Sequence, residues 1–380
     1  RVFVPEVNVP EAELVQGISA VGVRSLRQTV ALLTGAEEPD DPPVPPLDEV
    51  AGLSWTSAER LTHLDLADIA GQEDSRMALV VAAAGGHHML MTGPPGIGKT
   101  MLAQRLPGLL PDLTHEQSLA VSAVHSVAGV LPSESPLLRR PPFLDPHHTA
   151  SAVSIVGGGS KVIRPGALSL AHHGVLFLDE APEFSSNVLE ALRQPLESGH
   201  VVVSRAALTA AYPARFQLVL AANPCPCGLS SSVGDQCRCS PLSRRRYSDR
   251  LSGPIRDRID IHRSLSPLAR PELVHAMNGA RSTADLAAKV VEARDRQHRR
   301  LLDTPWSLNS GVPGVELRKH WPVTEEGRVL VDHQLRTNKL NARSADRILR
   351  LSWSVADLHG HDVPTGDDVD TALSLRRGTP

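Results

Sequence analysis

The sequence is poor in aromatic residues and in lysine. Phe, Trp and Tyr together make up only 3% of the chain, which argues against the aromatic platforms on which proteins stack nucleotide bases. Only five of the 39 basic residues are Lys, and the net charge is -3, so the chain has no overall positive field that would attract nucleic acid. Any contact with nucleic acid must therefore be local.

Long apolar segments are also missing. No apolar run approaches the length that a membrane-spanning helix needs, and no secretory signal peptide is visible. We therefore expect a cytoplasmic protein without a membrane partner. The first residue is Arg rather than Met, which indicates a fragment or a processed chain.

Length and composition indicate more than one domain. The 380 residues exceed one ordinary hydrophobic core. Residues 11–34 have helical periodicity that is interrupted near Gly22, and an acidic, proline-rich run follows. We expect residues 37–54 to form an extended linker. Because so short a stretch cannot make a stable domain, we expect residues 1–36 to be the end of a module that lies upstream.

The rest of the chain divides into two regions. Between about residues 60 and 265, strand-like runs at 88–92, 174–178 and 216–222 alternate with helical patterns. This alternation predicts an α/β domain with a mostly parallel sheet, which we place at 55–268. Strand signals stop after about residue 270, so we expect a helical bundle over 269–380. Its predicted helices span residues 283–302, 326–339, 343–358 and 365–376, and Thr365 with Asp368 predicts a capping box at the start of the last helix.

The strongest local signal is a glycine-rich segment at residues 93–100. It consists of Gly93, Pro94, Pro95, Gly96, Ile97, Gly98, Lys99 and Thr100, and it fits the pattern G-x-x-x-x-G-K-[ST] without a mismatch. An apolar run precedes it, and a helical pattern begins with Met101. This strand, loop and helix order predicts a phosphate-binding loop, so we expect the chain to bind a nucleoside triphosphate.

Each part of this loop has an expected task. Pro94 and Pro95 have no N–H, so the donors that face the phosphates must come from Gly96 onward and from the start of the helix, including Met101. Lys99 is expected to reach the β- and γ-phosphates. The hydroxyl of Thr100 is expected to bind Mg²⁺.

Two carboxylates follow the apolar run at 174–178. Asp179 is expected to hold Mg²⁺, and Glu180 is expected to activate the attacking water, because hydrolysis needs one carboxylate for the metal and a second one nearer the water. Asn223 follows the third predicted strand and is placed to lie between the γ-phosphate and that water. A solvated strand end and a simple Asn-Pro turn are the plain alternatives.

Four cysteines lie in one loop. They are Cys225, Cys227, Cys237 and Cys239, and the chain has no others. A reducing compartment disfavours disulfides and leaves zinc as the natural partner, because four thiolates give a tetrahedral structural site. The C-x-C spacing is less usual than C-x-x-C, so free thiols and a redox-labile pair remain open alternatives.

The order of these motifs resembles that of the AAA+ ATPases, in which ATP lies between adjacent subunits of a ring. Within that group the run HHTASAVSIVGGGSKVIRPGALSLAHHGVLFLDEAPEF resembles the magnesium-chelatase-like ComM/YifB family. The resemblance implies an α/β P-loop NTPase fold followed by an α-helical C-terminal lid bundle. It also implies that residues 1–36 are the end of a Lon-protease-like module.

The resemblance assigns further roles residue by residue. Asp179 and Glu180 match the Walker B pair, and Asn223 matches sensor 1. Arg258 matches the arginine finger, and Arg343 matches sensor 2. An arginine of this kind neutralises charge on the γ-phosphoryl oxygens in the transition state and can come from a neighbouring subunit.

Two segments resemble elements that line the ring's pore. Residues 147–168 match the helix-2 insert and contain Lys161, and residues 199–213 match the pre-sensor hairpin and contain Arg205. One cation per subunit, repeated around a ring, would contact DNA phosphates even though the chain is acidic overall. A solvated surface charge is the alternative for both residues.

The function implied by the resemblance is a ring of identical subunits, expected to be a hexamer, that couples ATP hydrolysis to movement on branched or single-stranded DNA. Its expected cofactors are ATP and Mg²⁺, with zinc as a further structural ion. Such an enzyme would drive branch migration during recombination of incoming DNA. Two alternatives remain at this stage: a motor subunit for magnesium insertion into a porphyrin, and a nucleotide-dependent scaffold or chaperone-like assembly factor that does not act on DNA.

Overall fold

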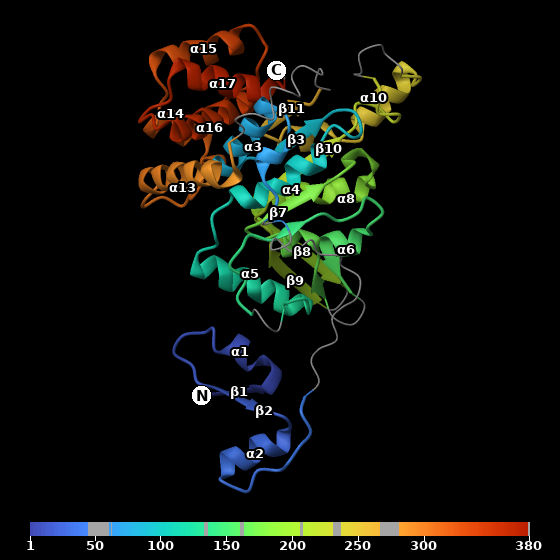
Figure 1. Ribbon diagram of the computed structural model, residues 1–380, viewed down its shortest axis with the longest axis vertical. Helices are drawn as coiled ribbons and strands as arrows, with labels where there is room; N and C mark the ends of the chain where they lie inside the picture. Colours follow the sequence, from blue (N-terminus) through green and yellow to red (C-terminus); the bar gives the residue numbers. More distant parts are fainter. Residues whose placement is uncertain are drawn as a thin grey trace. The chain divides into compact units, whose positions relative to one another are not determined.

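The computed structural model describes residues 1–44, 61, 63–132, 136–159, 163–205, 208–230, 237–266 and 281–378. The chain divides into two compact units (Figure 1). The first comprises residues 1–54 and 112–140, and the second comprises residues 55–111 and 141–380. None of the described helices is long and apolar enough to cross a membrane.

In the first unit, the N-terminal residues form a small α/β arrangement. Strands β1 (Val2–Pro5) and β2 (Ala20–Val23) pair in parallel, with η1 (Glu6–Asn8) and α1 (Val9–Ala12) between them. Helix α2 (Leu26–Thr34) follows, and Ser25 caps it by accepting a hydrogen bond from the Gln28 N–H. The unit also contains α5 (His115–Ala128).

The interruption of helical periodicity near Gly22 corresponds to residues 20–23 of strand β2. These residues form a strand because β1 offers a pairing edge, which local periodicity does not reveal. The described part of the expected linker, residues 37–44, contains no helix or strand. The remainder of the linker lies outside the described residues.

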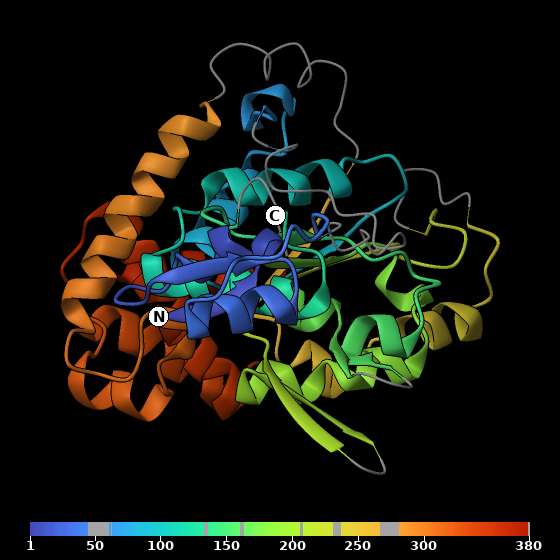
Figure 2. The same cartoon turned by 90° about the horizontal axis from the view of Figure 1, so that it is seen from below.

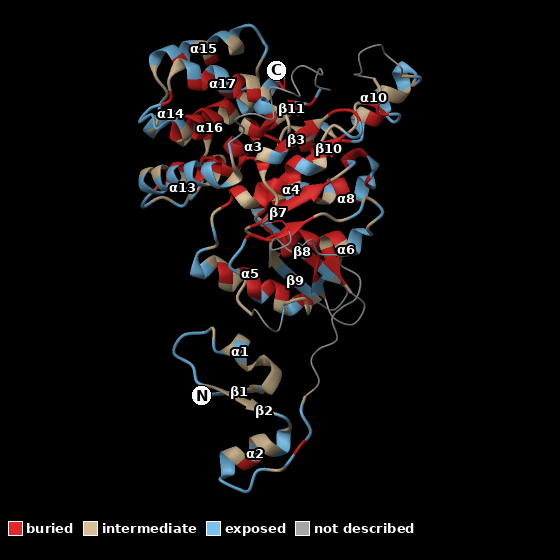
Figure 3. Cartoon of the chain, viewed as in Figure 1, coloured by how far each residue is buried: buried red, intermediate tan, exposed pale blue. Residues whose placement is uncertain are grey.

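A five-stranded sheet is the centre of the second unit. Its strands are ordered β11 (Ile261–Ser264), β3 (Met89–Thr92), β10 (Gln217–Ala222), β7 (Val175–Leu178) and β4 (Phe143–Leu144), and all neighbours are parallel. This confirms the mostly parallel sheet and the three predicted strands. Figure 3 shows the sheet as a largely buried layer, as expected for strands that are apolar on both faces.

The sequence did not predict two of these strands. β4 has only two residues, which is too short for a periodicity signal. β11 carries polar residues whose partners come from elsewhere in the fold: Arg263 forms an ion pair with Asp74, and His262 contacts Arg376. Burial lowers the pKa of His262 to about 4, with the nearby Arg376 charge acting in the same direction.

Helices pack against the sheet. Helices α3 (Glu73–Gly85) and α4 (Lys99–Leu109) bury their apolar residues in the same core as the strands, and Leu102, Leu106 and Leu109 are fully buried. The other elements of this region are η3 (Leu66–Asp68), α6 (Ala152–Val156), β5 (Gly157–Gly158), β6 (Arg164–Pro165), α7 (Ala167–Leu170), η4 (Ala181–Glu183), α8 (Ser186–Ala191), α9 (Arg193–Ser198), β8 (His200–Arg205), β9 (Leu208–Pro213), α10 (Pro241–Asp249) and α11 (Gly253–Arg256).

The C-terminal region is helical, as the sequence predicts. Its elements are α13 (Thr283–Arg300), η5 (Asn309–Gly311), α14 (Gly314–His320), α15 (Glu325–Arg336), α16 (Ala342–His359) and α17 (Gly366–Arg377). The four predicted helices correspond to α13, α15, α16 and α17, and α14 was not predicted. Helices α13 and α16 contact α3, and α17 contacts β11, so this bundle packs directly on the sheet domain (Figure 1).

The predicted capping box at Thr365 is confirmed. The Thr365 hydroxyl accepts from the Asp368 N–H, and the Asp368 carboxylate accepts from the Thr365 N–H. The fully buried Asp368 carboxylate also contacts His359 and His361, each at 2.8 Å. Its oxygens are thus occupied by hydrogen bonds that fix the start of α17.

A long hairpin projects from the second unit. Strands β8 and β9 pair antiparallel over six residue pairs, and Figure 2 shows this hairpin extending away from the body of the unit. Its Tyr212 hydroxyl donates to the Ile163 carbonyl at 2.8 Å, which joins the hairpin to the segment that contains α6 and α7. The two segments that the sequence analysis placed at the pore are therefore neighbours in space.

Candidate nucleotide site

Three strands of the sheet deliver the predicted site residues to one edge. The glycine-rich loop follows β3, Asp179 follows β7, and Asn223 follows β10, which lies between the other two strands. In the register, Ala222 pairs with Thr92 and Leu220 with Leu178, so the three strands end at nearly the same level. Ligands of open parallel sheets bind at this carboxyl edge.

The loop 93–100 has a backbone that glycine makes possible. Gly96 and Gly98 have φ values of 74° and 97°, in the left-handed region that side chains disfavour. Gly98 is also the N-cap of α4, so the chain turns directly from the loop into the helix. The free N–H groups at this helix start and the helix dipole favour a bound anion.

Lys99 is buried, and its ammonium is held by three oxygen atoms. It donates to the carbonyls of Gly93 at 2.7 Å and Pro94 at 2.9 Å, and to the Asn223 side-chain oxygen at 3.0 Å. Burial lowers the pKa of Lys99, and the negative charges of Asp179 and Glu180 act in the opposite direction. A buried cation with neutral hydrogen-bond partners is well suited to accept an anionic ligand.

The two predicted Mg²⁺ ligands lie next to each other. The Thr100 hydroxyl donates to the Asp179 carboxylate at 2.6 Å. Hydroxyl and carboxylate oxygens are the hard ligands that Mg²⁺ takes beside phosphates. The other Asp179 oxygen accepts from the Glu180 N–H at 2.8 Å, which orients the carboxylate. Thr100 and Asp179 would therefore hold a magnesium ion, which would supply positive charge beside the phosphates.

Glu180 has a constrained backbone and a partner that sequence analysis missed. Its φ of 51° is in the left-handed region, and its side chain is about half exposed. His148 Nδ1 lies 3.3 Å from a Glu180 carboxylate oxygen. His148 precedes Glu180 by 32 residues and comes from the segment after β4. No local sequence motif predicts the contact between His148 and Glu180, because this contact depends on the pairing of β4 with β7.

The two predicted arginines do not join these contacts. Arg258 donates to the Pro254 carbonyl at 2.5 Å and forms an ion pair with Glu197 on α9. Arg343 is exposed in the first turn of α16. Among the interactions of the described residues, neither arginine contacts Lys99, Thr100, Asp179, Glu180 or Asn223. The structure thus links these five predicted residues by hydrogen bonds and leaves both arginines outside this group.

A buried polar network joins the segments that carry the two arginines. Arg347, one turn after Arg343 on α16, donates to the Arg258 carbonyl at 3.3 Å and forms an ion pair with Asp260. Asp260 is buried and also contacts His87 at 3.0 Å. Burial acts to raise the pKa of Asp260, but the hydrogen bond from His87 and the charges of His87 and Arg347 lower it far below its usual range.

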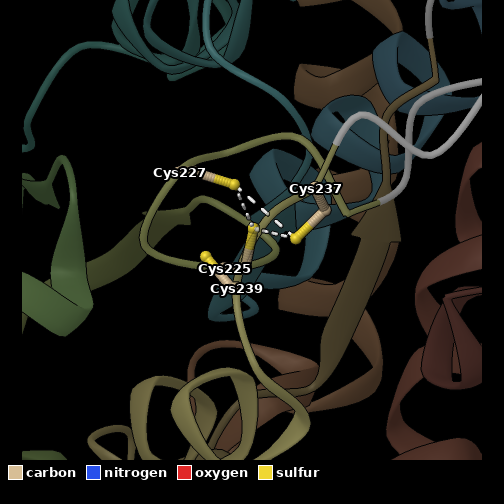
Figure 4. Close-up of side chains that lie close together, drawn as sticks. All are labelled: Cys225, Cys227, Cys237 and Cys239. Atoms are coloured by element: carbon tan, nitrogen blue, oxygen red, sulfur yellow. Dashed lines mark hydrogen bonds between the residues drawn. The ribbon is translucent and has the colours of Figure 1, made fainter.

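The four cysteines gather in one cluster after Asn223 (Figure 4). The Sγ atoms of Cys225 and Cys227 are 3.3 Å apart, and each lies 3.6 Å from Cys237 Sγ. All four sulfur atoms, including that of Cys239, lie within 4.8 Å of one another, and none is in a disulfide. A tetrahedral ion with ~2.3 Å bonds to sulfur separates its ligands by about 3.8 Å, so the cluster fits a structural zinc site.

The structure does not describe the side chains of the two residues that are predicted to contact DNA. Lys161 lies outside the described residues. Arg205 occupies the last position of β8, opposite Leu208 at the tip of the hairpin, and the described structure does not include its side chain. Both assignments remain predictions.

Comparison with known proteins gives two matching families and several relatives. The family "Magnesium chelatase, subunit ChlI" matches residues 65–291, and the family "Magnesium chelatase, subunit ChlI C-terminal" matches residues 280–376. An uncharacterized protein of Mycobacterium tuberculosis is 45% identical over 377 residues, which cover 99% of this chain and 72% of that protein. YifB of Escherichia coli and the competence protein ComM of Haemophilus influenzae are each 38% identical over 377 residues, or 99% of this chain and 71% of each relative.

Proposed function

Because the chain belongs to the magnesium-chelatase-like AAA+ proteins of the ComM/YifB type, we propose that it is a cytoplasmic, ring-forming ATPase that uses ATP hydrolysis to move along DNA. Branch migration during recombination is the proposed task. We propose the ring to be a hexamer, with each ATP held between two subunits.

The observation that carries the ATPase proposal is the contact group at the sheet edge. Lys99 is joined to Asn223, and Thr100 is joined to Asp179, across three different strands. In the proposed reaction, Lys99 neutralises the β- and γ-phosphates while Thr100 and Asp179 hold Mg²⁺. Glu180 polarises the attacking water, and Asn223 orients it. Arg258 and Arg343 stabilise the charge that develops on the γ-phosphoryl group.

The DNA proposal is supported by the projecting hairpin and by its neighbour. The Tyr212 to Ile163 hydrogen bond holds the hairpin that carries Arg205 beside Ile163, which is two residues after Lys161 in the sequence. Repeated around a ring, these cations would contact successive phosphates of a strand in the pore. The printed name of the Haemophilus relative, competence protein, is compatible with a role in the uptake or recombination of DNA.

We also propose that the cysteine cluster holds one zinc ion per chain. The support is the set of sulfur separations, which are close to those of a tetrahedral tetrathiolate site, and the absence of a disulfide among the four. When bound, zinc would cross-link the loop between β10 and α10. Free thiols are the alternative.

The experiment that tests the function is an ATPase measurement with and without DNA. The purified chain is assayed with four-way junction, forked, single-stranded and fully duplex DNA at equal nucleotide concentration. We expect branched or single-stranded DNA to raise the rate several-fold, and Arg205→Ala to reduce this stimulation while the basal rate stays the same. If none of these DNA substrates changes the ATPase rate of an assembled ring, the proposed movement along DNA is contradicted. That result would favour a scaffold or assembly factor.

A magnesium-chelatase motor is a second candidate because its families match most of the chain. These matches begin at residue 65, whereas YifB and ComM align over 99% of the chain. The additional N-terminal match favours the DNA motor. Stimulation of the ATPase by porphyrin-binding chelatase subunits, with none by DNA, would favour the chelatase function instead.

A further inference from the structure

We propose that metal binding by the cysteine cluster controls the nucleotide site, because the loop that the metal would close is packed directly against the residues that hold the triphosphate. This inference rests on the proposed ATPase function and deepens it. The cluster would then act as a metal-dependent regulator of ATP binding and turnover in addition to holding a loop in place.

The first connection is through the chain itself. Cys225 follows Asn223 by two residues and is fully buried. Asn223 in turn accepts the hydrogen bond from Lys99. Among the described residues between Ala222 and Pro241 there is no helix or strand, so secondary structure does not fix these residues. A change at Cys225 is therefore transmitted to the Asn223 amide over a very short path.

The second connection is the close packing of Gly228 against the Pro95 ring of the phosphate loop. Gly228, one residue after Cys227, has a φ of 78° and donates its N–H to the Cys225 carbonyl at 2.9 Å. A Cβ atom at position 228 would lie only 2.6 Å from Pro95 Cδ. The cysteine loop and the glycine-rich loop thus pack together so closely that only glycine fits between them. A shift of Gly228 toward Pro95 would therefore press on the glycine-rich loop.

The third connection comes from the helix that follows the last cysteine. Tyr247 on α10 is buried, and its hydroxyl lies near the Asn223 backbone, which acts to lower the pKa of the phenol. Burial, together with the charges of Glu183 and Glu180, raises the pKa of Tyr247 to about 12, so the phenol stays neutral. Arg250, next to the end of α10, donates to the Pro182 carbonyl at 2.8 Å and to Glu183 at 3.1 Å.

The described residues between Asn223 and Arg250 therefore reach all three parts of the nucleotide edge: the glycine-rich loop, the end of β10, and the turn after Asp179 and Glu180. A tetrathiolate ion would join the two halves of this segment, Cys225 and Cys227 on one side and Cys237 and Cys239 on the other. Loss of the ion would free the halves from each other and loosen Asn223 and Pro95. Coupling of this kind must be reciprocal, so bound nucleotide also strengthens metal binding.

The test uses the full chain with its native metal. Metal content is measured by elemental analysis, and zinc is then removed with a zinc-selective chelator in excess Mg²⁺. Affinity for a fluorescent non-hydrolysable ATP analogue, ATPase rate and circular dichroism are recorded before removal, after removal and after zinc is added back. We expect about one zinc per chain, a roughly tenfold loss of analogue affinity, a larger loss of rate, and recovery with zinc.

Reciprocity gives a readout that does not depend on catalysis. The analogue is expected to raise zinc affinity, measured by competition with a chromogenic chelator, by the same factor by which zinc raises analogue affinity. Equal analogue affinity with and without zinc, or zinc affinity that ignores the analogue, would overturn the inference. A chain that binds no metal at all would also overturn it.

Two variants test the connections while keeping all four cysteines. Tyr247→Phe removes the hydroxyl at Asn223, and we expect unchanged zinc content with a several-fold lower kcat and a weaker response of analogue affinity to zinc. Gly228→Ala forces the Cβ against Pro95 and should weaken analogue binding about tenfold. Its control is Gly360→Ala, which has a similar φ of 81° and a nearest neighbour at an ordinary 3.4 Å. Gly360→Ala is expected to leave analogue affinity unchanged.

Failure of this inference can be told apart from failure of the proposed function. If the zinc-loaded chain does not hydrolyse ATP under any condition, the ATPase proposal fails. If it hydrolyses ATP equally well with and without zinc while Tyr247→Phe behaves as wild type, the ATPase proposal stands and the coupling fails.

Discussion

Within one chain, the residues that would hold the triphosphate are already linked by hydrogen bonds, whereas the two arginines that would act on it make none of the described contacts with them. We refer to Lys99, Thr100, Asp179, Glu180 and Asn223 as the nucleotide group and to Arg258 and Arg343 as the arginine pair. The nucleotide group is linked by hydrogen bonds from Lys99 to Asn223 and from Thr100 to Asp179. Arg258 instead pairs with Glu197, and Arg343 is exposed on α16.

This difference indicates that the nucleotide group binds the triphosphate, whereas the arginine pair acts from another part of the assembly. A group built from adjacent strand ends of one sheet is preorganised before ligand arrives, and such preorganisation lowers the cost of binding. The arginine pair lies on segments joined through Arg347 and Asp260, so the two arginines are expected to move together. The arrangement suits a site in which one subunit supplies the nucleotide group and its neighbour supplies an arginine.

The largest effect is expected from the nucleotide group. Lys99→Ala removes the buried cation and leaves Asn223 and two loop carbonyls without their donor, so ATP binding should fall at least ~100-fold and turnover should vanish. Binding of a fluorescent ATP analogue and phosphate release check this. The matched control is Lys289→Ala on the exposed face of α13, which should behave as wild type. ATPase activity that survives in Lys99→Ala would break the assignment of the nucleotide group.

The arginine pair is tested next. Arg258→Ala should reduce hydrolysis about 10³-fold while analogue affinity stays within a few-fold of wild type. Mixing inactive Arg258→Ala subunits with inactive Lys99→Ala subunits tests whether Arg258 acts on the ATP of a neighbouring subunit. If the arginine acts on a neighbour's ATP, about a quarter of the seams in a random mixed ring have both parts intact, and activity returns. No recovery in rings that are shown to mix would place Arg258 outside the neighbouring site.

A smaller loss of rate is expected at Glu180. Glu180→Gln keeps the size of the side chain and removes the carboxylate, so ATP should bind as in wild type and hydrolysis should slow by about 10²-fold or more. Single-turnover measurements separate binding from chemistry. Wild-type turnover in Glu180→Gln would remove its role as water activator. His148→Gln, which retains a hydrogen-bond donor at the 3.3 Å contact, is expected to change the rate far less.

The smallest effect on the reaction, but a clear one on stability, is expected at Asp260. Asp260→Asn leaves Arg347 without its ion partner and should lower the free energy of unfolding by about 3 kcal/mol near neutral pH. Denaturant unfolding measures this change, and Asp370→Asn on the exposed face of α17 is the control. An unchanged free energy of unfolding would show that the network does not tie the arginine segments together.

The pH dependence of the same residue has a definite sign. Folding lowers the pKa of Asp260, so the carboxylate stabilises the fold above the unfolded pKa, and this contribution is lost as the pH falls. Between about pH 5 and about pH 3, the unfolding free energy of wild type should therefore fall more steeply than that of Asp260→Asn. Parallel pH profiles for the two proteins would contradict the lowered pKa.

Much of the nucleotide group was predictable because its signals are local. The glycine-rich loop, Asp179-Glu180 and Asn223 each follow an apolar run, and parallel strands bring their carboxyl ends to one edge. The helical C-terminal region and the Thr365 cap were predictable for the same reason, since periodicity and capping act over a few residues.

The features that escaped prediction depend on partners far away in sequence. β2 and β11 are strands because a neighbouring strand pairs with them, and the polar residues of β11 find Asp74 and Arg376 only in the fold. The contacts of Glu180 with His148 and of Arg258 with Glu197 likewise join segments with no shared motif. Packing of Gly228 on Pro95 could not be inferred from spacing at all.

The strand order has a consequence for how the protein is made. β10 lies between β3 and β7, although it is synthesised after both of them. Until residues 217–222 have left the ribosome, the inner edges of β3 and β7 have no pairing partner, and Lys99 lacks the Asn223 amide. Unpaired apolar edges invite association with other chains. The nascent protein therefore exposes the inner edges of β3 and β7 to other chains until β10 inserts between them.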